Sequence, residues 1–331
     1  SHVSSADTQA SQATPTPMPG PLGTAVLPSD GKILSGMYMS GKLDDVGKFG
    51  QATGKHASIL LIYQGWGSKD GSQYFPSSWA SSIRSQGAIP MITWEPWVEK
   101  EYPQGNNEPD FALKNIISGK FDSYIKSWAT AAKAWKGPFF LRFAPEMNGN
   151  WTPWSESENG NQAGEFVRAW RHIHTIFKDV GTTNATWVWC PNITYQGATP
   201  LSEFYPGDAY VDWTAMDGFN WGSARANSTW QSFSQVFKLT YKDILKLSKK
   251  PIMVAETASI EQGGNKADWI TQTYSVELPE QFPNIRAIVW FNQQTQEDWR
   301  INSSAASLAA FTAAMRSSLY TSNTFAKYTG G

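Results

Sequence analysis

The sequence predicts an α/β protein of one catalytic domain, a (β/α)₈ TIM barrel. Eight short apolar runs alternate with longer amphipathic stretches from residue 33 to the C-terminal region. With 331 residues, the chain is long enough for one such barrel. No glycine-rich phosphate-binding loop follows the first run, which counts against an open, doubly wound dinucleotide-binding sheet.

The eight runs are rich in β-branched and aromatic residues and are apolar almost without interruption. Strands that are buried on both faces of a parallel sheet have this pattern. The expected strands cover residues 33–40, 57–66, 88–97, 138–145, 185–192, 213–221, 251–259 and 285–292. Between them, helical periodicity predicts helices over residues 121–135, 165–180, 230–248, 266–278 and 303–318.

The N-terminal segment differs in composition from the rest of the chain. Residues 1–29 are rich in Ser, Thr, Ala, Gln and Pro, which predicts a disordered linker before a catalytic barrel over residues 30–331. The sequence starts without Met or the apolar core of a signal peptide, so we expect a secreted protein from which the signal has been removed. Cys190 is the only cysteine, and we expect it to pack in the core.

Charge and hydropathy exclude several classes of partner. The net charge is −1, from 27 basic and 28 acidic residues, and no basic stripe indicates nucleic-acid binding. No apolar run approaches the roughly 20 residues that span a bilayer, so we expect no membrane partner. No residues have the spacing of a metal site, and we expect no metal, no cofactor and a monomer.

Aromatic content is the unusual feature of the composition. Seventeen tryptophans are present, many of them beside polar residues. Flat apolar rings flanked by hydrogen-bonding groups suit sugar rings, although part of these side chains will be core. The sequence therefore favours a polysaccharide or oligosaccharide as the substrate.

Residues at the C-terminal ends of barrel strands form the active site in this fold. Here these ends carry acids, amides and aromatic rings. The candidate substrate-binding residues are Tyr38, Trp94, Glu95, Trp97, Arg142, Asn148, Trp151, Trp154, Asn220, Trp221, Trp290 and Asn292.

Two glutamates follow strands on opposite sides of the predicted barrel mouth. Glu146 follows the fourth expected strand, and Glu256 lies near the end of the seventh. One acid and one carboxylate facing each other are what glycosidic bond cleavage requires, with about 5–5.5 Å between them in a retaining enzyme. Either glutamate alone could form an ion pair with Arg142, but the two together favour a catalytic pair.

Residues 142–151 (RFAPEMNGNW) resemble the acid/base motif of glycoside hydrolase family 26. Further matches to this family are found at residues 94–97, 205–212, 250–256, 290–292 and 298–301. The resemblance implies a retaining β-glycanase with Glu146 as acid/base, Glu256 as nucleophile and Trp290 as the floor of subsite −1. It implies hydrolysis of a β-1,4-linked glycan such as mannan, or of mixed-linkage β-1,3-1,4-glucan, with β-1,3-xylan as the alternative.

Two positions depart from the family pattern. Mannan-cleaving relatives usually have His where Pro145 stands, so the axial 2-hydroxyl of mannose would lose a partner here. Relatives often have Tyr where Phe219 stands, and that hydroxyl usually binds the nucleophile. Arg142 or Asn220 is then expected to donate to Glu256, unless its pKa rises instead.

Two classes of protein compete with this interpretation. A non-catalytic carbohydrate-binding protein could use a degenerate barrel, but it would not need both glutamates. A Ser or Cys hydrolase is less consistent still, because no Gly-x-Ser-x-Gly motif or Cys–His arrangement is present.

Overall fold

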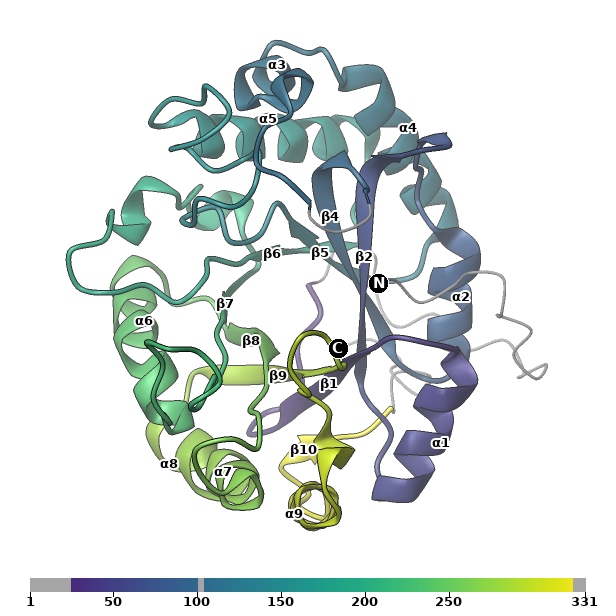
Figure 1. Cartoon of the computed structure of the whole chain (residues 1–331). Helices are drawn as coiled ribbons and strands as arrows, with labels where there is room; N and C mark the ends of the chain where they lie inside the picture. The colour runs from purple at the N-terminus through teal and green to yellow at the C-terminus, as the bar shows by residue number, and fades with distance from the viewer. Residues whose placement is uncertain (1–24, 101–103, 324–331) are drawn as a thin grey trace.

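Eight parallel strands form a closed ring at the centre of the molecule (Figure 1). The computed structural model describes residues 25–100 and 104–323. Each barrel strand pairs with the next, and β1 pairs with both β2 and β9, which closes the ring. The strands are β1 (Ile33–Met39), β2 (Ile59–Ser68), β4 (Ile89–Val98), β5 (Phe139–Phe143), β6 (Ala185–Trp189), β7 (Trp213–Asp217), β8 (Ile252–Thr257) and β9 (Ile285–Asn292).

The predicted (β/α)₈ barrel is therefore confirmed, and each of the eight apolar runs overlaps one of its strands, with β2 and β4 extending past the predicted ends. Two short strands extend the sheet beyond the ring. β3 (Gly71–Ser72) pairs antiparallel with β2, and β10 (Tyr320–Thr321) pairs parallel with β1.

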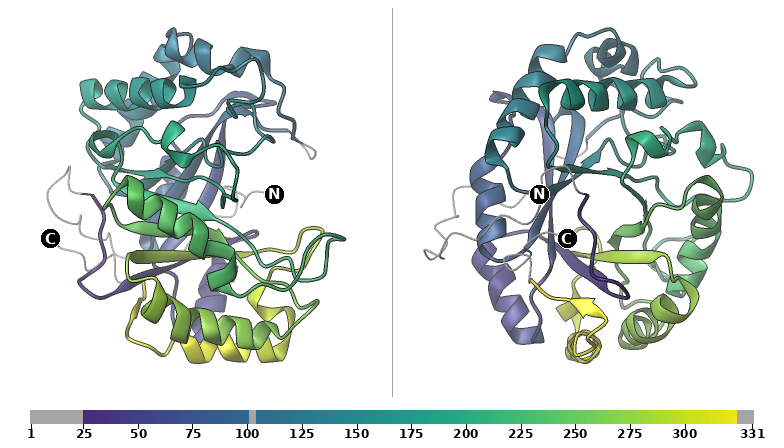
Figure 2. Two further views of the ribbon diagram at one scale, coloured as in Figure 1. Left: turned by 90° about the vertical axis from the view of Figure 1, so that its left-hand side faces the viewer. Right: turned by 180° about the vertical axis from the view of Figure 1, so that it is seen from behind.

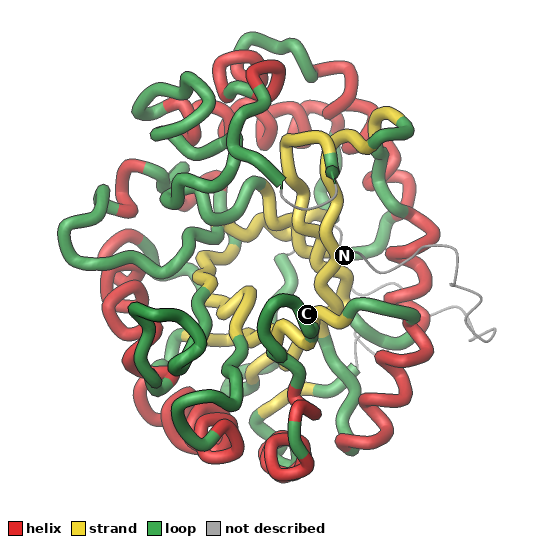
Figure 3. Tube along the Cα trace, in the orientation of Figure 1, coloured by secondary structure: helices red, strands yellow, loops and turns green. Residues whose placement is uncertain are grey.

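Helices surround the strands on the outside (Figure 3). Of the predicted helices, residues 165–180 begin and end as expected, and residues 266–278 contain α7, a π-helical turn (Thr273–Glu277) and the start of α8. The α-helices are α1 (Leu43–Thr53), α2 (Ser77–Ser85), α3 (Leu113–Ile117), α4 (Asp122–Trp135), α5 (Glu165–Val180), α6 (Phe233–Leu247), α7 (Lys266–Gln272), α8 (Leu278–Gln281) and α9 (Ala305–Ala314).

The apolar core has two layers, because successive strand residues point to opposite faces. Side chains of one layer fill the barrel interior, and those of the other lie between strands and helices. The interior layer contains Leu34, Leu61, Met91, Phe140, Val188, Trp213, Ala215, Met253, Ala287 and Val289. Most of the buried tryptophans belong to the outer layer, where apolar helix faces cover them.

The end of the barrel opposite the strand C-termini is closed partly by the segment that precedes β1. Val26 is buried with the interior cluster. Its N–H donates to Thr186 Oγ1 at 3.0 Å, and its carbonyl accepts from Trp213 Nε1 at 2.8 Å. The linker predicted over residues 1–29 thus meets the barrel at this point, while residues 1–24 lie outside the described residues.

Loops of very different length connect the elements at the C-terminal ends of the strands. In the side view, the loops that follow β7 and β9 project from this end of the barrel (Figure 2, left). Among the described residues, no helix is long and apolar enough to cross a bilayer.

Candidate active site

Glu146 and Glu256 face each other at the C-terminal end of the barrel, as the sequence predicts. Side-chain oxygens of Glu146, Asp217 and Glu256 all lie within 4.8 Å of one another. Glu256 is buried, and Glu146 is half-buried. The two catalytic candidates are therefore close enough to act on the same bond.

A β-bulge turns Glu256 into the barrel. On the β7 side, Met216 pairs with Val254, and the next residue of β7 pairs with Glu256. Ala255 is therefore an extra residue in β8. Strict alternation would place Glu256 on the outer face with Val254, and the extra residue brings it to the inner face instead.

Glu146 lies in a tight turn after β5. Its φ angle is 62° and that of Ala144 is 45°, both in the left-handed region that non-glycine residues rarely adopt. The turn is fixed by two hydrogen bonds: Glu146 N–H donates to the Cys190 carbonyl at 2.7 Å, and Trp154 Nε1 donates to the Pro145 carbonyl at 2.8 Å. Strain at this point is thus offset by contacts that aim the carboxyl group at the barrel mouth.

Arg142 lies on the inner face of β5 and is fully buried. Its Nη1 donates to Thr93 Oγ1 at 3.0 Å, and its Nη2 donates to Glu256 Oε2 at 2.5 Å and to Asp217 Oδ2. A buried guanidinium between two carboxylates satisfies their charge and fixes their positions. Arg142 therefore holds Glu256, rather than standing free to bind substrate.

Tyr63 supplies the second donor to Glu256. Its hydroxyl donates to Glu256 Oε1 at 2.7 Å from the inner face of β2. Both oxygens of Glu256 are thus bound, one by Tyr63 and one by Arg142. The predicted contact of Arg142 is found, whereas the expected donor Asn220 contacts Ser259 instead. The Tyr63 hydroxyl therefore makes the hydrogen bond to Glu256 that was expected from a tyrosine at the position of Phe219.

The surroundings of Glu146 keep its carboxyl group protonated near neutral pH. Burial raises the pKa of Glu146 to about 8, the negative charge of Glu256 adds to this shift, and Arg142 opposes it. In the amide orientation that satisfies its neighbours, the Asn192 side-chain nitrogen donates to Glu146 Oε1 at 3.1 Å. Sequence analysis did not single out Asn192.

Asp217 completes the charged group beneath the glutamates. Its carboxyl is buried, binds Arg142, and accepts a hydrogen bond from the Cys190 thiol at 3.1 Å. Burial raises the pKa of Asp217, and the ion pair with Arg142 opposes that rise. Three carboxyl groups this close could hold a metal ion, but the guanidinium already lies between two of them.

Aromatic rings line the barrel mouth on the side of β1 and β9. Tyr38 stacks on Phe291 with ring centroids 5.1 Å apart, and its edge meets Tyr63 at 4.9 Å. Phe219 contacts Phe291 edge to face at 5.8 Å. Tyr38, a predicted substrate-binding residue, is buried beneath Phe291 and Tyr63 and is only 1% exposed, so it supports the rings of the mouth rather than facing a ligand. Phe291 is the partly exposed aromatic residue of β9, and the sequence analysis did not single it out.

Three predicted sugar-binding tryptophans are structural instead. Trp94 and Trp290 have no exposed surface and lie in the outer layer, because they alternate with the inward-facing neighbours Glu95 and Phe291. Trp290 therefore does not floor a subsite; its Nε1 donates to the Trp299 carbonyl at 2.9 Å. The third, Trp154, is also fully buried and supports the turn at Glu146.

Two predicted amides are buried in loop contacts and are not available to a ligand. Asn220 donates to Ser259 Oγ at 2.9 Å, and its oxygen accepts from two backbone N–H groups. Asn292 accepts from Ile301 N–H at 2.7 Å. A third amide, Asn148, is half-buried and exchanges two hydrogen bonds with the backbone of Asn192.

The remaining predicted rings lie toward the surface. Trp97 is half-buried and packs on Trp154 at 4.8 Å. Trp221 meets Trp299 edge to face at 4.7 Å, and Arg225 stacks on it at 3.2 Å. These rings lie at the rim of the barrel, and Glu95 is half-buried on the inner face of β4.

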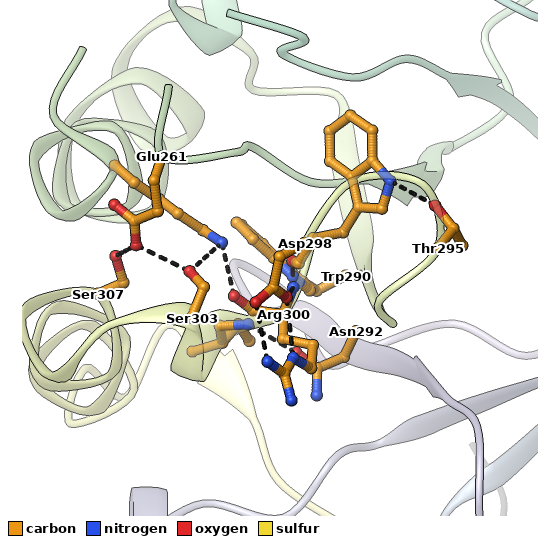
Figure 4. A network of polar contacts seen from close by, with 11 residues as sticks. Glu261, Trp290, Asn292, Thr295, Asp298, Arg300, Ser303 and Ser307 are labelled. Atoms are coloured by element: carbon orange, nitrogen blue, oxygen red, sulfur yellow. Dashed lines mark hydrogen bonds and ion pairs between the residues drawn. The ribbon is translucent and has the colours of Figure 1, made fainter. Parts of the chain in front are cut away.

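A polar network behind β9 fixes the loop that carries Trp299 (Figure 4). Buried Lys266 donates to the Arg300 carbonyl at 2.5 Å and to Ser303 Oγ at 2.7 Å. Ser303 in turn donates to Glu261 at 2.8 Å. This wall of the mouth is therefore anchored to α7.

A groove opens beside Glu146, between the loops that follow β5 and β6. Its volume is about 600 Å³, and Met147, Asn148 and Asn192 line it next to the acid. Trp151 and Tyr195 also line it and are 46% and 72% exposed. Polar groups and exposed rings together are suited to sugar residues.

A (β/α)₈ barrel with two facing carboxyl groups at its mouth has the arrangement that glycoside hydrolysis requires. Residues 96–277 match the family model of glycosyl hydrolase family 26. The chain belongs to this family, which confirms the resemblance and the enzyme class expected from the sequence.

Several characterised proteins are similar to this chain. Endoglucanase H of Acetivibrio thermocellus is 39% identical over 267 residues, which cover 80% of this chain but 28% of that protein. The chain thus spans under a third of that relative's length. Mannan endo-1,4-beta-mannosidase of Bacillus subtilis is 21% identical over 294 residues, 80% of this chain and 76% of that protein.

Solved structures agree on the fold. The Bacillus subtilis mannanase BCman superposes with a TM-score of 0.63 at 19% identity, covering 89% of this chain and 88% of that one. At this identity the likeness establishes the barrel alone.

Proposed function

We propose that the chain is a retaining endo-β-glycanase that hydrolyses mixed-linkage β-1,3-1,4-glucan or a β-1,4-linked glycan by double displacement. One observation carries the proposal: oxygens of Glu146 and Glu256 lie within 4.8 Å of each other. This spacing fits a retaining pair, since inverting enzymes leave about 6.5–9.5 Å for a water molecule.

In the first step, Glu146 acts as the acid and Glu256 as the nucleophile. Glu256 attacks the anomeric carbon while Glu146 gives its proton to the glycosidic oxygen, so the C–O bond breaks and the shortened chain leaves. The raised pKa of Glu146, about 8, keeps its proton available at neutral pH. Arg142 and Tyr63 orient the two oxygens of Glu256.

In the second step, Glu146 acts as a base. It removes a proton from water, whose oxygen attacks the anomeric carbon and displaces Glu256 from the ester. Both glutamates then return to their initial states. When Glu256 is esterified, its negative charge is lost, and the pKa of Glu146 falls because that charge had raised it.

Glucose-based polysaccharides are the proposed substrate class. The relative with 39% identity is named an endoglucanase. Pro145, next to the acid, offers no side-chain donor to an axial 2-hydroxyl, and its carbonyl is bound by Trp154. The axial 2-hydroxyl of mannose would therefore have no hydrogen-bond partner at Pro145. The 2-hydroxyl of glucose is equatorial and does not need a partner at this position.

Endo action is supported by the groove beside Glu146. The groove continues from the acid past Trp151 and Tyr195, so a leaving group longer than one sugar can lie in it. We also propose that the protein acts outside the cell, where polymeric substrates occur, and that it acts as a monomer.

The proposal is tested with two measurements. Reducing-sugar release from barley β-glucan, lichenan, glucomannan, galactomannan, curdlan and β-1,3-xylan should be largest for the mixed-linkage glucans. Proton NMR of the first-formed product should show the β-anomer. An initial α-anomer would contradict retention, and faster release from galactomannan or xylan would reassign the substrate.

A further inference from the structure

Glu95 is a carboxyl group at the reaction centre that the double displacement does not use. It follows Thr93 on the inner face of β4, and Thr93 binds Arg142 inside the barrel. Alternation along the strand points Trp94 to the outer layer and Glu95 to the inner face. Glu95 lies two residues beyond Thr93 and is therefore nearer the barrel mouth. Glu95 is half-buried, and its carboxyl has no hydrogen-bond partner among the described residues.

The position beside Glu95 on the neighbouring strand is a glycine. Glu95 pairs with Gly65 of β2, which has no side chain. The space beside Gly65 is taken by Glu99, whose Oε1 accepts from Gly65 N–H at 2.6 Å. Glu99 is thus engaged with the backbone, while Glu95 faces the mouth unbound.

The charges around Arg142 decide the protonation of Glu95. One guanidinium already binds Asp217 and Glu256, and Glu146 lies within 4.8 Å of both. A further buried negative charge would have no cation of its own. Burial raises the pKa of Glu95 well above its usual value, Arg142 opposes the shift, and Glu256 adds to it.

We propose that Glu95 binds the sugar at the reaction centre through a neutral carboxyl group, which donates one hydrogen bond to a ring hydroxyl and accepts another. A protonated carboxyl has one O–H donor and acceptor capacity, the pair that a sugar hydroxyl matches. The proposal rests on the proposed glycanase function. It makes Glu95 a substrate-contacting residue that neither attacks carbon nor transfers a proton.

Two substitutions at Glu95 separate this role from its alternatives. Glu95→Gln keeps the shape, a donor and an acceptor, so kcat/KM should stay within about threefold of the wild type. Glu95→Met keeps the length but cannot form either bond, and kcat/KM should fall by about ten- to a hundredfold. Glu280→Gln, at an exposed position on α8, is the matched surface control.

Each contrary outcome has a distinct meaning. If Glu95→Met is as active as the wild type, Glu95 does not contact substrate. If Glu95→Gln is as impaired as Glu95→Met, the ionised form is the active one. If either variant moves the alkaline limb of the pH profile, Glu95 acts by tuning Glu146. A wild-type protein inactive on every polysaccharide would instead refute the glycanase function.

A binding measurement provides a second readout that does not depend on the Met variant folding. In a Glu146→Gln background, oligosaccharide affinity should fall as pH rises and Glu95 ionises. The same background with Glu95→Gln should show a flat profile. The charged groups that act on Glu95 are Arg142 on β5, Glu256 on β8, Glu99 just after β4 and Glu146 just after β5. If affinity changed with pH in the same way in the two proteins, the proposal that Glu95 binds the sugar as a neutral donor would be overturned.

Discussion

The two glutamates proposed as the catalytic pair are the same type of residue in opposite surroundings. Glu256 lies in a strand, and both of its oxygens are bound, by Arg142 and Tyr63. Glu146 lies in a turn with positive φ, and among the described residues its carboxyl is reached by one donor, the Asn192 amide. A carboxylate held by a cation suits a nucleophile, whereas a desolvated carboxyl beside another acid suits a proton donor.

This difference in surroundings is the basis on which we propose the two roles. Arg142 is bonded to Glu256 and only lowers the pKa of Glu146 from a distance, which does not outweigh burial. The side chains that create this asymmetry come from β2 and β5, far from Glu256 in the chain. Variants that alter the surroundings of one glutamate and leave those of the other unchanged can therefore test which is the acid and which the nucleophile.

Glu256→Gln should have the largest effect. The amide keeps the shape but cannot attack the anomeric carbon, so kcat on polysaccharide should fall by about 10⁵-fold. Substrate affinity, measured by calorimetry, should persist. Activity near that of the wild type would show that Glu256 is not the nucleophile.

Glu146→Ala should have a smaller effect that depends on the leaving group. Without the acid, hydrolysis of polysaccharide should slow by about 10³- to 10⁴-fold. Aryl glycosides with a dinitrophenolate leaving group need no protonation, so formation of the glycosyl–enzyme should stay fast, and azide should restore turnover. Equal loss on both substrate types would contradict the assignment of Glu146 as the acid.

Tyr63→Phe should weaken the surroundings of Glu256 alone. Loss of one hydrogen bond to the nucleophile should lower kcat by about ten- to a hundredfold, with a small change in KM. Tyr74→Phe makes the same change at an exposed position and serves as the control. A wild-type rate for Tyr63→Phe would show that Arg142 suffices to position Glu256.

The role of Tyr63 could not be predicted from sequence, because its partner lies 193 positions away, across the barrel. The strands and the glutamate pair could be predicted, since apolar runs and strand-end acids are local patterns. The predicted sugar contacts of Trp94, from its place at a strand end, and of Trp290, from the family resemblance, are wrong because alternation along the strands points both rings to the outer layer. Alternation alone would also have misplaced Glu256, which reaches the inner face only through the bulge at Ala255.

The pH profile of kcat/KM tests the surroundings of Glu146. Its pKa is raised to about 8, so the protonated acid predominates below that pH and is lost above it. Activity should therefore fall on the alkaline side, with a limb near pH 8 and about a tenfold loss for each further unit. A limb near pH 5 would mean that Glu146 is not desolvated as described.

Trp290→Phe should have the smallest effect on activity. It tests whether the outer face of β9, where Trp290 lies, takes part in substrate binding. Trp290 is buried outside the barrel, against Trp269 and the Trp299 carbonyl, and contacts neither glutamate. Its substitution should cost about 1–3 kcal/mol of stability, seen as a lower Tm, while kcat/KM stays within about twofold.

The matched change on the other face of β9 is Phe291→Ala. Phe291 stacks on Tyr38 at the barrel mouth, so its loss should raise KM. If Trp290→Phe raised KM and Phe291→Ala did not, the floor of the sugar site would lie on the outer face of β9. The register that pairs Tyr38 with Phe291 would then be wrong, and with it the inward placement of Glu256 on the adjacent strand.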